Sequence, residues 1–196
     1  MFLCILNNEA IAAHGAGIWT GPGSSLELLK TQVLHNENKT GDFGGGIASG
    51  DSAVIIKAST IANNTAGDGG GLYSQPGSVT IQDSYVTGNK AVSGGGGGIN
   101  LRGGGKSGMK YVVIRDNEAL VGDGGGIFVD VNSLTVRSST VHHKTSKSDP
   151  GCEYKLLFMG TYNKKTDTMQ WHATTTACGT SQGVLAGFAY LTRETE

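Results

Sequence analysis

The feature that most constrains the fold is a repeat in which an asparagine is followed by a glycine run. Each run ends in an aliphatic residue, eight to eleven positions after the asparagine. These aliphatic residues are Ile18, Ile47, Leu72, Ile99 and Ile127. Their successive spacings are 29, 25, 27 and 28 residues, a period typical of stacked coils in which each unit packs against its neighbours. The chain is therefore expected to form a solenoid and not a single globular core.

Each repeat also contains a strand-like segment in which two apolar residues alternate with other residues. The apolar pairs are Leu26/Leu28, Val54/Ile56, Val79/Ile81 and Leu134/Val136. A hydroxyl column follows at Thr31, Ser59, Ser84 and Ser139, and an aliphatic column then precedes each asparagine by three positions. The fourth repeat fits least well, because Ser107 and Met109 replace its apolar pair. The alignment predicts an all-β parallel β-helix with two or three short strands in each coil.

Asparagine and glycine have separate expected roles in such a coil. The asparagines Asn36, Asn64, Asn89 and Asn117 are expected to stack inward as a ladder of amide hydrogen bonds. The structural glycines Gly46, Gly71, Gly98 and Gly126 are expected where the chain needs a positive φ or a close backbone approach.

Two motifs alternate along the chain, for example Val33-Leu34-His35-Asn36 and Gly44-Gly45-Gly46-Ile47. They resemble the polymorphic outer membrane protein repeat, with its Phe-x-x-Asn and Gly-Gly-Ala-Ile signatures. The resemblance covers residues 5–143, and an aliphatic residue replaces the phenylalanine throughout. The match is thus to the broad class of right-handed β-helix repeats. The resemblance implies a right-handed helix of about five coils in a secreted or surface-exposed, passenger-type domain that is often adhesive.

The composition changes after the last repeat. Residues 1–143 are interpreted as the β-helix, and residues 144–196 as a small C-terminal β cap or a fragment of a further domain. Within the tail, Tyr154–Tyr162 and Met169–Thr176 look like the strands of a hairpin. Cys152 and Cys178 either pair as a disulfide or remain free thiols.

Charge and hydrophobicity exclude some classes of binding partner. The net charge is −1 without a basic stripe in the sequence, which argues against nucleic acid. No apolar stretch is long enough to span a membrane. Ile5-Leu6-Asn7-Asn8 already looks like the end of a repeat, so the chain is expected to begin inside a coil and to belong to a longer surface protein.

Acidic residues are the candidates for a metal-binding or catalytic site. The Gly-Asp pairs that contain Asp42, Asp68 and Asp123 are expected to stack, and stacked carboxylates would bind Ca²⁺. Gly-Asp is also a favoured turn pair, and turn chemistry is the preferred reading. Other acidic residues, such as Asp83 and Asp130, are scattered between columns, so no catalytic residue is assigned.

Two functions are consistent with these observations. The first is a non-enzymatic scaffold or adhesin that binds a protein or glycan along a solenoid face, outside the cell or at the outer membrane surface. The second is a carbohydrate-active enzyme, either a pectate-lyase-like polysaccharide lyase or a glycoside hydrolase, with its site on one face. The absence of a convergent acidic motif favours the first.

Overall fold

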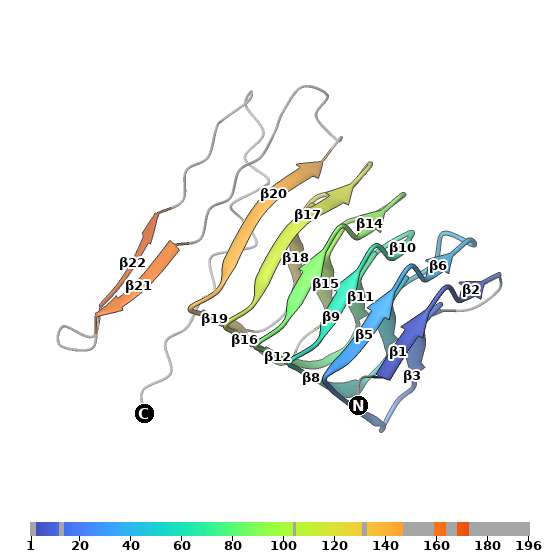
Figure 1. Ribbon diagram of the computed structural model, residues 1–196, viewed down its shortest axis with the longest axis horizontal. Helices are drawn as coiled ribbons and strands as arrows, with labels where there is room; N and C mark the ends of the chain where they lie inside the picture. Colours follow the sequence, from blue (N-terminus) through green and yellow to red (C-terminus); the bar gives the residue numbers. More distant parts are fainter. Residues whose placement is uncertain are drawn as a thin grey trace.

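In the computed structural model of the protein, residues 3–11, 14–103, 105–130, 133–146, 159–163 and 168–172 are described. The described residues form strands, bends and turns, without any helix. Figure 1 shows the strands stacked as successive coils along one axis. Every strand pair within the coils is parallel, and about five coils are present, so the predicted all-β parallel solenoid is confirmed.

Three sheets run along the solenoid axis. Sheet 1 contains β3 (Ile18–Thr20), β7 (Ile47–Ser49), β11 (Leu72–Ser74), β15 (Ile99–Arg102) and β18 (Ile127–Asp130). Sheet 2 contains β4 (Ser25–Leu29), β8 (Ser52–Lys57), β12 (Gly77–Gln82), β16 (Lys106–Lys110) and β19 (Ser133–Arg137). The strand-like segments expected from the sequence are therefore the strands of sheet 2.

Sheet 3 is bent. Each of the first four coils contributes two short strands to it, and each later coil contributes one longer strand. Its first row contains β1 (Leu3–Leu6), β5 (Thr31–Leu34), β9 (Thr60–Ala62), β13 (Tyr85–Thr87), β17 (Val113–Ala119) and β20 (Thr140–Ser146). Its second row contains β2 (Glu9–Ala10), β6 (Glu37–Asn38), β10 (Thr65–Ala66) and β14 (Lys90–Ala91), and joins the first through β17.

The apolar columns expected from the sequence pair in register and fill the interior. Ile47 pairs with Leu72 in sheet 1, Ile56 with Ile81 in sheet 2, and Ile61 with Val86 in sheet 3. All of these side chains are almost completely buried. Met109 continues the sheet 2 column and is also buried, so the poorly matching fourth repeat keeps the same register.

The hydroxyl column forms a second chain of hydrogen bonds between coils. The Thr31 N–H donates to Ser59 Oγ at 3.0 Å, and the Ser59 N–H donates to Ser84 Oγ at 3.1 Å. Val112 occupies the next position and cannot accept such a bond, although its own N–H donates to Ser139 Oγ. The column is therefore interrupted where the sequence replaces its hydroxyl.

Two corners of each coil are turned by single residues with positive φ, which the sequence analysis did not identify. One corner precedes the hydroxyl column, at Lys30, Ala58, Asp83, Tyr111 and Ser138. The other precedes the ladder asparagine, at Asn7, His35, Asn63, Gly88 and Asp116. A single left-handed residue lets the chain change direction sharply between two strands.

The tail contains one described hairpin. β21 (Met159–Asn163) and β22 (Thr168–His172) pair in an antiparallel manner, as expected for two strands joined by a short loop. β20 continues to Ser146 in register with β17, beyond the expected end of the repeats. The proposed domain boundary and the role of the tail remain predictions, and Cys152 and Cys178 lie outside the described residues.

Candidate binding face on sheet 1

The asparagine column lies at the bend of sheet 3 and is completely buried at Asn36 and Asn64. Asn64 Nδ2 donates to Asn89 Oδ1 and to the Val33 carbonyl, both at 2.9 Å. Asn64 Oδ1 accepts from the Asn36 N–H and from Asn36 Nδ2, both at 2.9 Å. Asn117 is the last asparagine of this series, because Lys144 occupies the register position in the next coil. Its Oδ1 accepts from Asn89 Nδ2 at 3.0 Å. The amides of Asn36, Asn64 and Asn89 are thus satisfied by the coils on either side.

The last glycine of each run faces this ladder across the coil. A Cβ on Gly46 would lie 3.0 Å from Asn64 Nδ2 and 2.6 Å from the Gly71 carbonyl oxygen. Gly71 and Gly98 face Asn89 and Asn117 in the same way. These glycines are therefore required by close approach, whereas positive φ belongs to the glycine two positions earlier, such as Gly44 at 67°. The Gly126 carbonyl accepts the Ile99 N–H at 2.9 Å and would lie 2.6 Å from a Cβ on Gly98.

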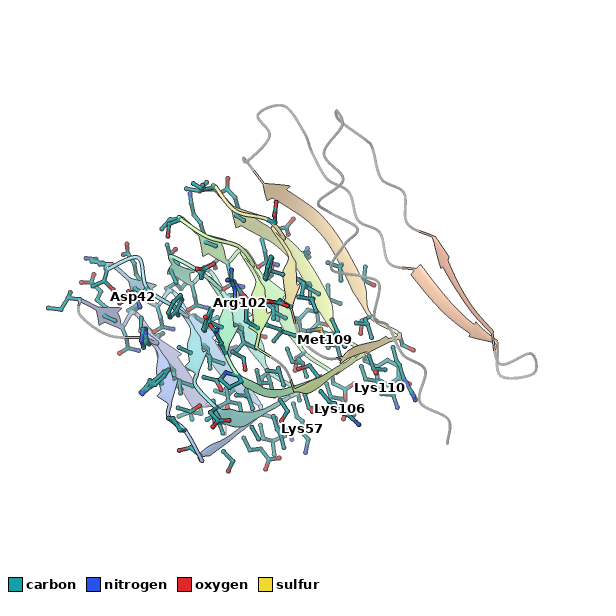
Figure 2. All side chains as sticks on the ribbon, turned by 180° about the vertical axis from the view of Figure 1, so that it is seen from behind. Asp42, Lys57, Arg102, Lys106, Met109 and Lys110 are labelled. Atoms are coloured by element: carbon teal, nitrogen blue, oxygen red, sulfur yellow. The ribbon has the colours of Figure 1, made fainter. Side chains whose placement is uncertain are left out.

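The expected stack of three aspartates is wrong in part. Phe43, and not Asp42, pairs with Asp68 in a parallel bridge, and the Gly44 N–H donates to the Asp68 carbonyl at 3.0 Å. The Asp42 turn has one extra residue, Phe43, between the aspartate and the first glycine. Gly95 occupies the next place in the column, because the Gly69 N–H donates to its carbonyl, and Asp123 follows. Asp42 lies apart from Arg102 in Figure 2.

One carboxylate oxygen of Asp42 and one of Asp68 have protein partners. Asp42 Oδ2 accepts from the Thr40 hydroxyl at 3.1 Å, and Asp68 Oδ1 accepts from the Gly95 N–H at 2.7 Å. In the part of the chain that the structure describes, no group of three or more His, Cys, Asp or Glu side chains is placed to hold a metal ion.

The outward side of sheet 1 carries a column that contains three aromatic residues. The middle residues of its strands are in register, and they are Trp19, Ala48, Tyr73, Asn100 and Phe128. The residue four positions before the start of each of these strands lies beside this column, and these residues are His14, Phe43, Asp68, Gly95 and Asp123. The two columns together define what we call the sheet 1 face.

Aromatic rings form a continuous row over the first three coils of this face. The His14 ring centroid lies 5.3 Å from that of Trp19 and 5.1 Å from that of Phe43. Phe43 stacks on Tyr73 with a centroid separation of 4.3 Å and an interplanar angle of 15°. Trp19 is 48% exposed, while Tyr73 is 5% exposed. The row thus has a buried base and one solvent-facing indole, whose distal edge rests against Gly50.

A polar cluster follows the aromatic row on the same face. Asn100 Nδ2 donates to Asp68 Oδ1 at 3.1 Å, and Arg102 Nε donates to Asn100 Oδ1 at 3.1 Å. An Arg102 guanidinium nitrogen lies 3.6 Å from Asp68 Oδ1. The Arg102 guanidinium also lies over the Phe128 ring, 4.7 Å from its centroid. These contacts join three successive coils and orient the guanidinium on the surface.

Tyr73 connects the aromatic row to the polar cluster. Its hydroxyl donates to the Gln75 side-chain oxygen. Burial raises the pKa of the Tyr73 phenol above its ordinary value, Arg102 opposes this shift, and the negative charge of Asp68 adds to it. Tyr73 therefore stays neutral and acts as a packing and hydrogen-bonding group at physiological pH.

Asp83 and Asp116 have partners outside this cluster, whereas Asp130 lies on the strand beside it. Asp83 accepts from the neighbouring Gln82 amide at 2.9 Å, and Asp116 lies 3.7 Å from Arg115 on its own strand. Asp130 pairs in register with Arg102 at the end of β18.

The sequence analysis missed the aromatic face because its column repeats no residue type. The only available signal was the equal distance of Trp19, Tyr73 and Phe128 after a glycine run.

A parallel solenoid with an inward asparagine ladder and glycine-lined turns defines a β-helix protein. The chain matches the family described as "Right handed beta helix region" over residues 3–156, and it belongs to this family. The right-handed class expected from the repeat is thereby confirmed, whereas the match does not extend to polymorphic outer membrane proteins in particular. No curated protein and no solved structure matches the chain. Among the described residues, no helix is long and apolar enough to cross a membrane.

Proposed function

We propose that this chain is a non-catalytic binding solenoid that holds a glycan along the sheet 1 face. The observation that carries the proposal is the row of rings from Trp19 to Tyr73, followed directly by the Asp68–Asn100–Arg102 cluster. Sugar rings have one apolar face that stacks on aromatic side chains and hydroxyl groups that bond to amides, carboxylates and guanidinium groups. Both kinds of group are present in succession on this face.

The geometry favours a linear ligand aligned with the solenoid axis. Parallel strands in neighbouring coils lie about 4.8 Å apart, which is comparable with the length of one sugar residue in an extended polymer. Equivalent positions in successive coils would therefore meet successive sugars. Trp19 offers the exposed stacking surface, and Arg102 is held in place by Asp68 and Phe128.

We assign the protein to the cell exterior or cell surface as part of the same proposal. Its support is the resemblance of the Val33-to-Asn36 and Gly44-to-Ile47 motifs to repeats of surface-exposed passenger domains. The enzymatic alternative would need an acid and a base that converge on one scissile bond. The Asp68 carboxylate is instead engaged by Gly95, Asn100 and Arg102, which supports a structural role for it.

Replacement of the exposed indole tests the proposal. Trp19→Ala is expected to weaken retardation of the full chain in gels that contain a soluble neutral polysaccharide, such as xylan or galactomannan, by roughly two- to tenfold. Tyr85→Ala is the matched control, because Tyr85 is 53% exposed and belongs to sheet 3. Equal retardation of both variants and the parent would contradict a glycan site at Trp19.

A further inference from the structure

The outward side of sheet 2 forms a second surface, separate from the sheet 1 face. Side chains alternate along its strands, so Met109 points into the core while Lys106 and Lys110 point outward. Lys110 is in register with Arg137 on one side and with Gln82 on the other, and Gln82 is in register with Lys57. Figure 2 shows Lys57, Lys106 and Lys110 along one side of the molecule, away from Arg102.

Positive charge is concentrated at the C-terminal coils of this surface. Lys57 Nζ is paired with Glu27 at 3.1 Å, which neutralises the N-terminal part. Within the described residues, neither Lys106 nor Lys110 forms an ion pair. The outward side chains described on β12, β16 and β19 include no carboxylate, so these coils present cations among hydroxyl and amide groups.

The outward column in the middle of the sheet 2 strands lies between these cations and consists of small or hydroxyl residues. Thr80 is in register with Gly108, which is in register with Thr135. A Cβ built on Gly108 would meet only the Thr135 carbonyl oxygen, at 4.0 Å, so the space above the glycine is open. The column of Thr80, Gly108 and Thr135, with Lys106 on one side and Lys110 on the other, forms a polar strip along the axis that we call the sheet 2 track.

We propose that this sheet 2 track binds a linear acidic polysaccharide, independently of the sheet 1 face. Lys110 and Arg137 lie in register on successive coils, and Lys106 lies across the track from Lys110, which complements a polymer that carries a carboxylate or sulfate on successive residues. Thr80 and Thr135 are placed to bond to its hydroxyl groups. A single-stranded nucleic acid would need a succession of aromatic platforms for its bases. None of the described outward side chains on β12, β16 and β19 is aromatic, and the exposed Tyr111 ring directly after β16 already contacts the Lys110 ammonium, 5.0 Å from the ring centroid.

The test measures retention of the full chain on immobilised dextran sulfate and polygalacturonate, with uncharged dextran as the blank. The variant Lys106→Gln with Lys110→Gln is expected to bind the acidic polymers roughly five- to tenfold more weakly. The matched control is Lys39→Gln with Lys90→Gln, which removes the same charge from lysines paired with Glu9 and Glu118 on sheet 3. The control pair is expected to retain binding.

Three results would overturn the proposal. Absence of retention by the parent protein at low salt would show that the track does not bind acidic polymers. Equal weakening by both double variants would assign binding to net charge and not to the track. Stronger competition by a single-stranded DNA oligonucleotide than by dextran sulfate would assign the surface to nucleic acid. Trp19→Ala is expected to leave binding of acidic polymers unchanged, so the two surfaces are tested separately.

Discussion

At the scale of single residues, the hydrogen bonds of the asparagine ladder explain why polar amide side chains can be buried in the core. Asn64 uses both of its amide hydrogens and both lone pairs of its oxygen on neighbouring coils. A leucine has a similar volume but cannot donate or accept. Its introduction would leave the Asn36 amide groups and the Val33 carbonyl without their partner.

Asn64→Leu is therefore expected to lower the free energy of unfolding, because each buried group that loses its partner costs about 1–3 kcal/mol. Thermal unfolding followed by circular dichroism measures the effect. Gln32→Leu on the exposed side of β5 serves as the control, because its side chain lies outside the ladder. A melting temperature equal to that of the parent would contradict a stabilising ladder.

Tyr73 makes a pH-dependent contribution to stability. Its pKa is raised in the folded state, mainly by burial, so the folded protein holds the phenol proton more tightly than the unfolded chain. The contribution is complete below the ordinary pKa near 10 and is lost as the pH rises through the higher folded value. Urea unfolding of the parent is expected to show a loss of stability above pH 10 that Tyr73→Phe reduces. Identical alkaline profiles for the two proteins would contradict burial of the phenol.

At the scale of the structural elements, each coil depends on the pairing of a glycine with an asparagine across its interior. The turn before sheet 1 must approach the bend of sheet 3, and Gly46 leaves room for the Asn64 amide. This contact explains why the sequence repeat couples the two residue types. The glycine two positions earlier, such as Gly44, has a different role, because its backbone has a positive φ.

Gly46→Ala is expected to destabilise the protein by about 1–3 kcal/mol, since the added methyl group would collide with the Gly71 carbonyl oxygen and the Asn64 amide. Gly108→Ala is the matched control, because the space above it is open and its φ is not positive. Chemical unfolding in guanidinium chloride compares the two. Equal stability of the two variants would show that Gly46 is not closely packed.

The elements also show what the sequence can predict. The apolar, hydroxyl, asparagine and glycine columns were predictable because each repeats one residue type at a nearly constant spacing. The corners were not, because Lys30, Ala58 and Tyr111 share a positive φ without sharing chemistry. The aspartate alignment failed because Phe43 lengthens one turn, and a repeat period does not reveal which turn absorbs an extra residue.

At the scale of the whole molecule, the stacking of coils turns scattered residues into surfaces. Residues that lie about 28 positions apart in the sequence become neighbours about 4.8 Å apart, as Tyr73 and Asn100 do on sheet 1. The same stacking places Arg137 beside Lys110 on sheet 2, although the chain as a whole has a net charge of −1. The surfaces therefore depend on the register between coils more than on overall composition.

The measurement that tests the account most directly combines retention and turnover for the full chain. The protein is incubated with neutral and acidic polysaccharides, with and without Ca²⁺, and bound protein and released oligosaccharides are both quantified. The account predicts retention on at least one polymer without release of oligosaccharides, and weaker retention on neutral polymers for Trp19→Ala. Reproducible release of oligosaccharides would contradict the binding role and identify the protein as a carbohydrate-active enzyme.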